Sequence, residues 1–258
     1  MTSSSAPGIK PLTGRLSGDR VHPKPSMVPD DLVARFRALD DLSSTVSDVL
    51  DELGVGAAIG AHELRPTIGD AVVIGRAVTV RNVRRNRDVY VATSEKNPLM
   101  EEIEGINQAD PGDVLVIEGV EGVSNMGGMM ASIAHRQQIA GVVVHGGVRD
   151  VGQARSLPLP TWSTAVTPVT GKSRCETVEV NGPIEICGVA VTAGDLVIAD
   201  ETGVCFVPAE LCEKVVQRCE AIAERERRYL ASIANGDSVP DLAKQYKPPR
   251  PISEEAGQ

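Results

Sequence analysis

The sequence predicts an α/β fold, and three observations support this prediction. Apolar, β-branched runs at 112–120 and 141–147 have the length of buried strands, and segments with helical spacing alternate with such runs. Aromatic residues make up only 2% of the chain, so its core must be built from small and branched side chains. With 258 residues and no internal repeat, we expect one domain over 28–236, an N-terminal extension at 1–27 and a C-terminal tail at 237–258.

The N-terminal half of the domain is expected to contain helices followed by strands. Apolar residues recur with helical spacing over 29–54, in two stripes that begin at Leu32 and Val46. A strand with β-branched alternation is expected over 70–83. A helix over 90–112, closed by an Asp-Pro-Gly turn, then leads to the strand at 112–120.

The C-terminal half continues with a helix after Gly127 and Gly128, the strand at 141–147 and a short helix. The segment 157–166 is predicted to be an edge strand, because its prolines cannot donate hydrogen bonds to a central ladder. Short strands separated by turns are expected over 176–208, and a long amphipathic helix ends at Gly236.

Charge and cysteine usage limit the partners and the compartment. The net charge of −9 argues against a nucleic-acid partner, and the one basic cluster, 81–89, is interpreted as a solvated strand end or a subunit contact. Five cysteines without metal-ligand spacing indicate reduced thiols. The N-terminus lacks the apolar core of a secretory signal, and no apolar run approaches about 20 residues. We therefore expect a cytoplasmic protein without a membrane partner.

A candidate site lies where the N-terminus of the predicted helix and the carboxyl end of the strand at 141–147 face each other. The backbone amides of Gly127, Gly128, Met129 and Met130 are expected at a helix N-terminus, where carboxylates and phosphates bind, although tight packing explains a glycine pair about as well. Arg149 and Asp150 follow the strand, after a turn at Gly146 and Gly147, and ligands collect at the carboxyl ends of such strands. The combination suits a small anionic substrate, with Arg149 on its carboxylate and Asp150 on a divalent metal.

Five segments, read together, resemble the RraA-like family: STVSDVLDELG, GRAVTV, PGDVLVIEG, GGMMASIAHRQQIAGVVVHGGVRD and AGDLVIADETGVCFVP. This family includes class II 4-hydroxy-4-methyl-2-oxoglutarate aldolases and the regulator of ribonuclease activity A. The resemblance spans roughly residues 30 to 210. It implies a swivelling β/β/α domain that assembles as a homotrimer or a hexamer, with sites between subunits.

The resemblance also assigns roles to the residues of the candidate site. Arg149 is expected to bind the pyruvyl carboxylate and the enolate oxygen, Asp150 to ligate Mg²⁺ or Mn²⁺, and the amides of Met129 and Met130 to hold the substrate carboxylate. The aldolases carry an acidic residue, then a spacer of twenty residues, and then the Arg-Asp pair. In this chain that position is Gly128, so the acid that helps to hold metal-bound water is absent.

Three further residues are candidates with two interpretations each. His145 occupies a position where Asp or Asn is usual in the family; it is either a strand-end histidine bonded to backbone or a neutral imidazole that replaces the missing acid as ligand or base. Asp200 and Glu201 lie in a strand-end turn, where acids either reach a neighbouring subunit's site or belong to a solvated β-turn.

Two classes of function remain open from the sequence. The first is a metal-dependent lyase acting on a small 2-oxo acid, by retro-aldol cleavage or oxaloacetate decarboxylation through a pyruvate enolate. The second is a non-catalytic binding or regulatory protein. A Schiff-base mechanism has little support, because Lys172 lies in a loop and is expected to be exposed. Methyl transfer is discounted, because no glycine-rich nucleotide loop followed by an acidic strand end is found.

Overall fold

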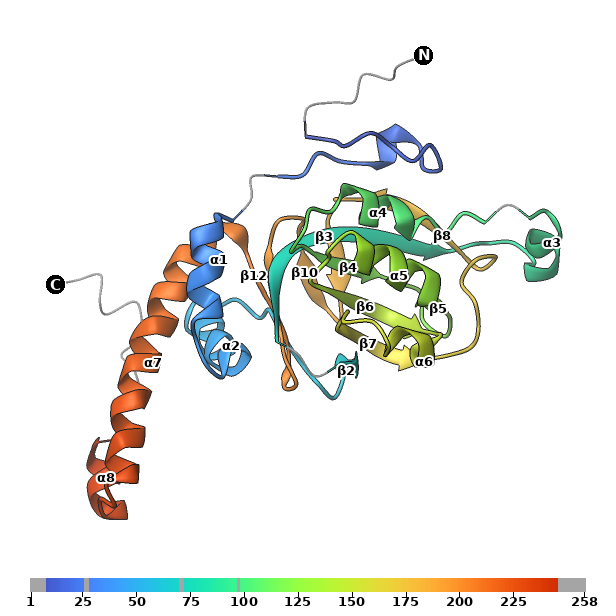
Figure 1. The fold of residues 1–258 in the computed structure, drawn as a ribbon. Coiled ribbons are helices and arrows are strands. Elements are labelled where there is room, and N and C mark those ends of the chain that lie inside the picture. The colour runs from blue at the N-terminus through green and yellow to red at the C-terminus, as the bar shows by residue number, and fades with distance from the viewer. Residues whose placement is uncertain (1–7, 26–27, 70–71, 97, 246–258) are drawn as a thin grey trace.

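The computed structural model describes residues 8–25, 28–69, 72–96 and 98–245. It confirms the mixed α/β class, with helices on both sides of one large sheet (Figure 1). Residues 1–7 and 26–27 of the expected N-terminal extension, and residues 246–258 of the expected C-terminal tail, lie outside the described residues.

The helices and strands follow one another along the whole described chain. The helices are η1 (Gly18–Arg20), α1 (Asp30–Arg37), α2 (Leu42–Glu52), α3 (Val89–Ser94), α4 (Glu102–Gln108), α5 (Gly128–Arg136), α6 (Val151–Ala154), η2 (Ala209–Leu211), α7 (Cys212–Ala234) and α8 (Val239–Gln245). The strands are β1 (Ala58–Gly60), β2 (Arg65–Ile68), β3 (Val73–Arg84), β4 (Val114–Glu118), β5 (Ser124–Met126), β6 (Gly141–Val148), β7 (Thr161–Val166), β8 (Cys175–Val180), β9 (Ile184–Ile186), β10 (Val189–Val191), β11 (Leu196–Ala199) and β12 (Gly203–Val207).

The large sheet has the strand order β1-β12-β11-β3-β4-β6-β7-β2, with β8 paired to β3 and β5 paired to β6. Its centre is parallel: β3, β4, β6 and β7 run in the same direction, and so does β5 beside β6. The flanking pairs that involve β1, β2, β8, β11 and β12 are antiparallel. The parallel centre brings the carboxyl ends of β4, β5 and β6 to the same edge of the sheet.

The central strands are buried on both faces. Along β4, Val114 and Val116 belong to one hydrophobic cluster, whereas Leu115 and Ile117 belong to another, because successive side chains of a strand point to opposite faces. This explains why the strand reads as a continuous apolar run rather than as an alternating one.

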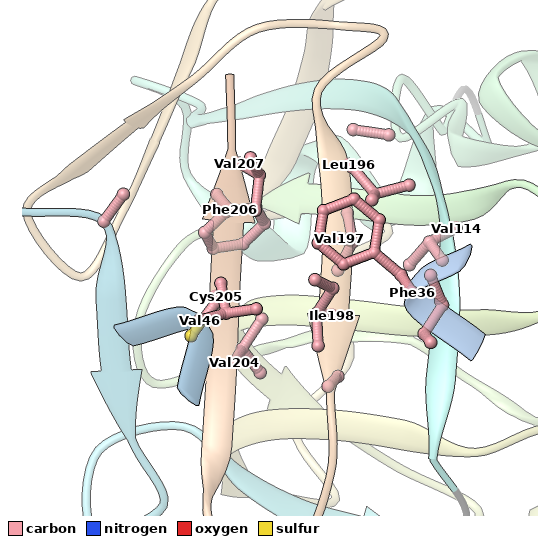
Figure 2. Close-up of a cluster of buried hydrophobic side chains, with 14 of the residues drawn as sticks. Phe36, Val46, Val114, Leu196, Val197, Ile198, Val204, Cys205, Phe206 and Val207 are labelled. Atoms are coloured by element: carbon pink, nitrogen blue, oxygen red, sulfur yellow. The ribbon is translucent and has the colours of Figure 1, made fainter. Parts of the chain in front are cut away.

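The first of these clusters lies between β11 and β12 and helices α1, α2 and α7. Phe36 from α1 and Val46 from α2 point toward the two strands and are fully buried (Figure 2). The apolar stripes predicted from helical spacing are thus the faces that pack on the sheet. Removing a fully buried phenylalanine such as Phe36 typically costs about 3–5 kcal/mol.

Two secondary-structure predictions outside the candidate site were wrong. The segment 90–112 is not one helix but contains α3 and α4; Pro98, which has no backbone N–H to donate, lies between them. The strand over 161–166 is not at an edge, because it pairs with both β6 and β2. Pro158 and Pro160 precede its first residue, Thr161, so they remove no ladder hydrogen bond from the strand.

Residues 8–25 pack against α4 and β8 (Figure 1). The backbone N–H of Thr13 donates to Glu104 at 2.9 Å, and Lys24 lies 2.7 Å from Asp110. Arg15 forms an ion pair with Glu101, with 2.7 Å between Arg15 Nε and Glu101 Oε2. This part of the expected extension is therefore packed against the domain. Among the described residues, no helix has the length and apolar character needed to cross a membrane.

Candidate active site

Strand β6 places Arg149 and Asp150 at the carboxyl edge of the parallel sheet. Its last residue, Val148, pairs with Met126 of β5, and the N–H of Arg149 donates to the carbonyl oxygen of Met126 at 3.0 Å. Because α5 starts directly after β5, Gly127 lies beside Arg149. Two chain segments that the sequence separates by twenty residues thus meet at the site, as predicted.

The glycine pair before Arg149 lies within β6 and not in a turn, which corrects the sequence interpretation. Side chains are excluded there by a close approach of the preceding loop. A Cβ on Gly147 would lie 2.6 Å from the carbonyl oxygen of Val123, and one on Gly146 would lie 2.4 Å from Asn125 Nδ2. Asn125 is fully buried and its amide bonds to the backbone of Val120, so the loop is held firmly against the strand.

Asp150 links this strand end to the start of α5. Its backbone is left-handed, with φ 57°, an uncommon conformation for a residue other than glycine. Its Oδ2 accepts a hydrogen bond from the N–H of Gly128 at 3.0 Å and lies 3.5 Å from Arg149 Nε. A Cβ on Gly127 would lie 3.1 Å from both of these charged groups, so a glycine there lets them lie over the helix N-terminus.

A cavity of about 240 Å³ opens at this point. Five of the predicted site residues line it: Gly127, Met129, Met130, Arg149 and Asp150. Its other walls come from the N-terminal segment, the start of α4, the strand β5 and the loop before β8. These walls are formed by Arg15, Pro98, Met100, Glu101, Glu102, Ile103, Ser124, Met126, Thr170 and Lys172.

The charged residues of these other walls were missed by sequence reasoning. Lys172 is exposed, as predicted, but it lines the cavity. Glu101 and Glu102 are both 4% exposed. Burial raises the pKa of Glu102 to about 7. The neighbouring negative charge of Glu101 also raises this pKa, whereas the positive charges of Lys172 and Arg15 lower it. The sequence signal that could have pointed to these two glutamates was a pair of adjacent acids before an apolar stripe, but acids are common at any helix N-terminus.

The structure does not bring His145 together with these residues. Its Nδ1 accepts a hydrogen bond from the backbone N–H of Cys187 at 3.2 Å, and the residue does not line the cavity. Gly128 takes part only through its backbone N–H, which bonds to Asp150. No group of three or more His, Cys, Asp or Glu side chains placed to hold a metal ion is found in the part of the chain that the structure describes.

Asp200 and Glu201 lie at the opposite end of the sheet. Ala199, just before them, pairs with Val73 at the amino end of β3, whereas the cavity lies at the carboxyl ends of β5 and β6. Although burial opposes it, hydrogen bonds from Thr202 and Ser43 lower the pKa of Asp200. Within one protomer, this turn does not contribute to the cavity.

Comparisons with known proteins agree with this architecture. The chain is 28% identical over 228 residues to the protein DlpA of Legionella pneumophila; the match covers 87% of this chain, which spans only 36% of DlpA. It is 33% identical over 116 residues to a 4-hydroxy-4-methyl-2-oxoglutarate aldolase of Thermus thermophilus, with 44% of this chain and 69% of that protein covered.

A solved structure has the same fold. The Streptomyces coelicolor protein RraAS2, described as an unusual member of the RNase ES inhibitor RraA family, superposes with a TM-score of 0.65 at 25% identity. The superposition covers 80% of this chain and 98% of the other. The family model RraA-like (Aldolase/RraA) matches residues 43–206, a span that includes α5, β6 and the Arg149-Asp150 pair. The chain therefore belongs to the RraA-like family, which also contains proteins named as 4-hydroxy-4-methyl-2-oxoglutarate aldolases.

Proposed function

We propose that the protein is a divalent-metal-dependent carbon–carbon lyase acting on a small 2-oxo acid. The reactions in view are retro-aldol cleavage of a 4-hydroxy-2-oxo acid and decarboxylation of oxaloacetate, both of which pass through the enolate of pyruvate. The supporting observation is the convergence of Arg149, Asp150 and the N-terminus of α5 on one cavity.

Arg149 is suited to hold the substrate's carboxylate and the adjacent oxygen. Its guanidinium presents a planar set of donors, and such charge-assisted pairs are among the stronger hydrogen bonds in proteins. The amides of Met129 and Met130 lie in the first turn of α5, where the helix dipole favours an anion. Together they would orient the C2–C3 bond of the substrate toward the remaining walls of the cavity.

Asp150 is the residue proposed to hold the metal. The donor set fits Mg²⁺ or Mn²⁺ only in part: one carboxylate lines the cavity beside Arg149, and Mg²⁺ is commonly held by one or two carboxylates together with waters and substrate oxygens. The cation would supply Lewis-acid stabilisation of the negative charge that develops on the substrate oxygen. Asp150 itself is oriented by the N–H of Gly128, so its carboxylate is held in place before a ligand arrives.

We also propose that the working form is a homotrimer or a dimer of trimers. Met129 lines the cavity and is 63% exposed, so it is available for contact with a neighbouring subunit. In such an assembly the turn that holds Asp200 and Glu201, which is remote from the cavity within one protomer, would reach a neighbour's site.

The test is an assay for pyruvate release, coupled to lactate dehydrogenase, with oxaloacetate and a panel of 4-hydroxy-2-oxo acids. Each substrate is measured with Mg²⁺, with Mn²⁺ and with chelator. Chelator-sensitive pyruvate release that is lost in Arg149→Ala supports the proposal. No release from any of these substrates with either cation contradicts it.

A second candidate function is a non-catalytic binding or regulatory role. Gly128 supports it, because the resemblance places an acid at this position and the chain has none. The likeness to RraAS2 also points this way, since that protein is described within an inhibitor family. Binding of an anion in the cavity without any turnover would favour this second function.

A further inference from the structure

Two adjacent acids at the start of α4 face very different environments. Glu101 is paired: Arg15 Nη2 donates to its Oε1 at 3.0 Å, and Arg15 Nε lies 2.7 Å from its Oε2. The Oε2 atoms of both acids are buried without a hydrogen bond among the described residues, but that of Glu101 lies in the ion pair with Arg15, whereas no ion pair to Glu102 is found in the described part of the chain. An unpartnered buried oxygen is energetically costly, so it requires an explanation.

The place of Glu102 in the fold supplies that explanation. Glu102 lines the same cavity as Arg149 and Asp150, but it belongs to α4, whereas those two residues follow β6. A ligand held by Arg149 would therefore have the carboxyl group of Glu102 on another wall. This group has a free oxygen with which to accept or donate one proton.

We propose that Glu102 is the acid–base residue of this site: it takes the proton from the hydroxyl of a 4-hydroxy-2-oxo acid and gives a proton to C3 of the pyruvate enolate. This role rests on the proposed function. In the cleavage step, the O–H proton moves to the Glu102 carboxylate, the C3–C4 bond breaks and the carbonyl group of the departing product forms. The electron pair of the broken bond becomes that of the enolate. In the second step, the protonated Glu102 protonates C3 and returns to its carboxylate.

The same residue would serve oxaloacetate. There the C3–C4 bond breaks with loss of CO₂, and the enolate again takes its proton at C3 from protonated Glu102, which is reprotonated from water. The reverse of this step, removal of a methyl proton from pyruvate by the Glu102 carboxylate, would exchange the methyl protons with solvent. This exchange isolates the proton transfer from the cleavage of the carbon–carbon bond.

The electrostatic surroundings suit a group that must change its protonation state near neutral pH. Burial holds the pKa of Glu102 at about 7, close to the value at which a general acid and base works best. The titratable and charged groups that face it come from the N-terminal segment, the start of α4, the β6–α6 junction, the loop before β8, and β8 itself. They are Arg15, Glu101, Arg149, Asp150, Lys172 and Cys175.

The test is hydrogen–deuterium exchange of the methyl group of pyruvate in D₂O, followed by proton NMR with Mg²⁺ or Mn²⁺. The wild type is expected to catalyse the exchange with a pH dependence that has an inflection near 7. Glu102→Gln is expected to slow the exchange by about 10²–10⁴-fold, the usual contribution of a general base. Binding of oxalate, measured by calorimetry, should be retained, because Arg149 and the α5 amides are unchanged.

A matched control uses another buried acid of the same helix. Glu104 is fully buried, bonds to Thr13 and does not line the cavity, so Glu104→Gln should keep an exchange rate close to that of the wild type. If Glu102→Gln does not fold, Glu102→Asp, which withdraws the carboxyl group from the cavity, takes its place with the same expectation of slowed exchange. A further readout needs neither metal nor substrate: the infrared carbonyl band of a protonated carboxyl group should disappear as the pH rises through 7, and Glu102→Gln should lack it.

The outcomes separate the two proposals. Exchange by the wild type that is undiminished in Glu102→Gln overturns the role of Glu102 and leaves the proposed function standing. An infrared band that is unchanged in Glu102→Gln also counts against that role. No exchange by the wild type with either cation overturns the proposed function, and the role of Glu102 with it.

Discussion

The burial of Glu102 predicts a specific change in how the stability of the protein depends on pH. Its pKa is about 7 in the folded chain and 4.5 for an ordinary glutamate, because burial disfavours the charged form. Between these two values the folded chain binds more protons at this site than the unfolded chain does. The stabilising contribution of protonated Glu102 to the free energy of unfolding is therefore fully present below pH 4.5 and is lost as the pH rises to 7.

The magnitude follows from the separation of the two pKa values. A difference of about 2.5 pH units corresponds to roughly 3 kcal/mol, at about 1.36 kcal/mol per unit. Glutamine has a similar shape and stays neutral at every pH, so Glu102→Gln lacks this contribution. Relative to the wild type, the variant should gain roughly 3 kcal/mol of unfolding free energy between pH 4.5 and pH 7.

The measurement is urea unfolding followed by circular dichroism at a series of pH values. The protein concentration is held constant, because oligomerisation contributes to apparent stability. Glu104→Gln is a control of opposite sign: burial raises the pKa of Glu104, but hydrogen bonds from Thr13, Asn107 and Gln108 prevail and lower it. The contribution of Glu104 is thus present above the ordinary pKa and is lost as the pH falls. If the wild type and Glu102→Gln showed parallel pH profiles, the argument about Glu102 would be refuted.

Three other predictions concern the opposite wall of the cavity and the assembly. Arg149→Lys should weaken oxalate binding by about 10–100-fold in calorimetry, because a point charge cannot reproduce the planar fork; unchanged affinity would make Arg149 only a structural partner of Asp150. Gly128→Asp should fold, since its Cβ would meet the mobile end of Gln153 at 2.5 Å and Asp150 Cβ at 3.2 Å, and it should bind Mn²⁺ more tightly through a second carboxylate; a folded variant with unchanged Mn²⁺ affinity and unchanged rate would show that the missing acid is irrelevant. Sedimentation velocity should show a trimer or hexamer, and a stable monomer at micromolar concentration would contradict the proposed assembly.

The parts of the site that sequence predicted are those set by local pattern. The apolar run of β6 and the glycine pair before α5 both have short-range signatures, and a parallel strand delivers the residue after it to a known edge. Arg149 and Asp150 were therefore found at the cavity. The turn expected at Gly146 and Gly147 was wrong, because the close approach of Val123 and of Asn125 in β5 requires glycine within a strand as well.

The parts that sequence missed depend on contacts between distant segments. Glu102 lines a cavity whose other walls come from the segment that contains Arg15 and from the loop that contains Lys172. These segments are distant in the sequence: 86 positions separate Arg15 from its partner Glu101. No periodicity within 98–108 distinguishes a buried acid from the solvated acids that are common in the first turn of a helix. The prediction that β7 is an edge strand failed for a related reason, because Pro158 and Pro160 lie just before the strand in which they were expected to prevent hydrogen bonding.

The loss of an acid at Gly128 and the presence of an unpaired acid at Glu102 bear on the same charge balance. Three cationic side chains line the cavity, Arg15, Arg149 and Lys172, and they face three carboxyl groups, those of Glu101, Glu102 and Asp150. With Glu102 protonated, the lining carries one net positive charge, and with Glu102 ionised it carries none. An anionic 2-oxo acid is therefore held better by the form in which Glu102 is protonated, and by linkage its binding must raise the pKa of Glu102 further. That shift favours the decarboxylation of oxaloacetate, in which Glu102 only donates a proton to C3, over retro-aldol cleavage, in which the Glu102 carboxylate must first accept one. An additional ionised acid at position 128 would act against it by removing the excess positive charge, unless a bound cation offset that acid.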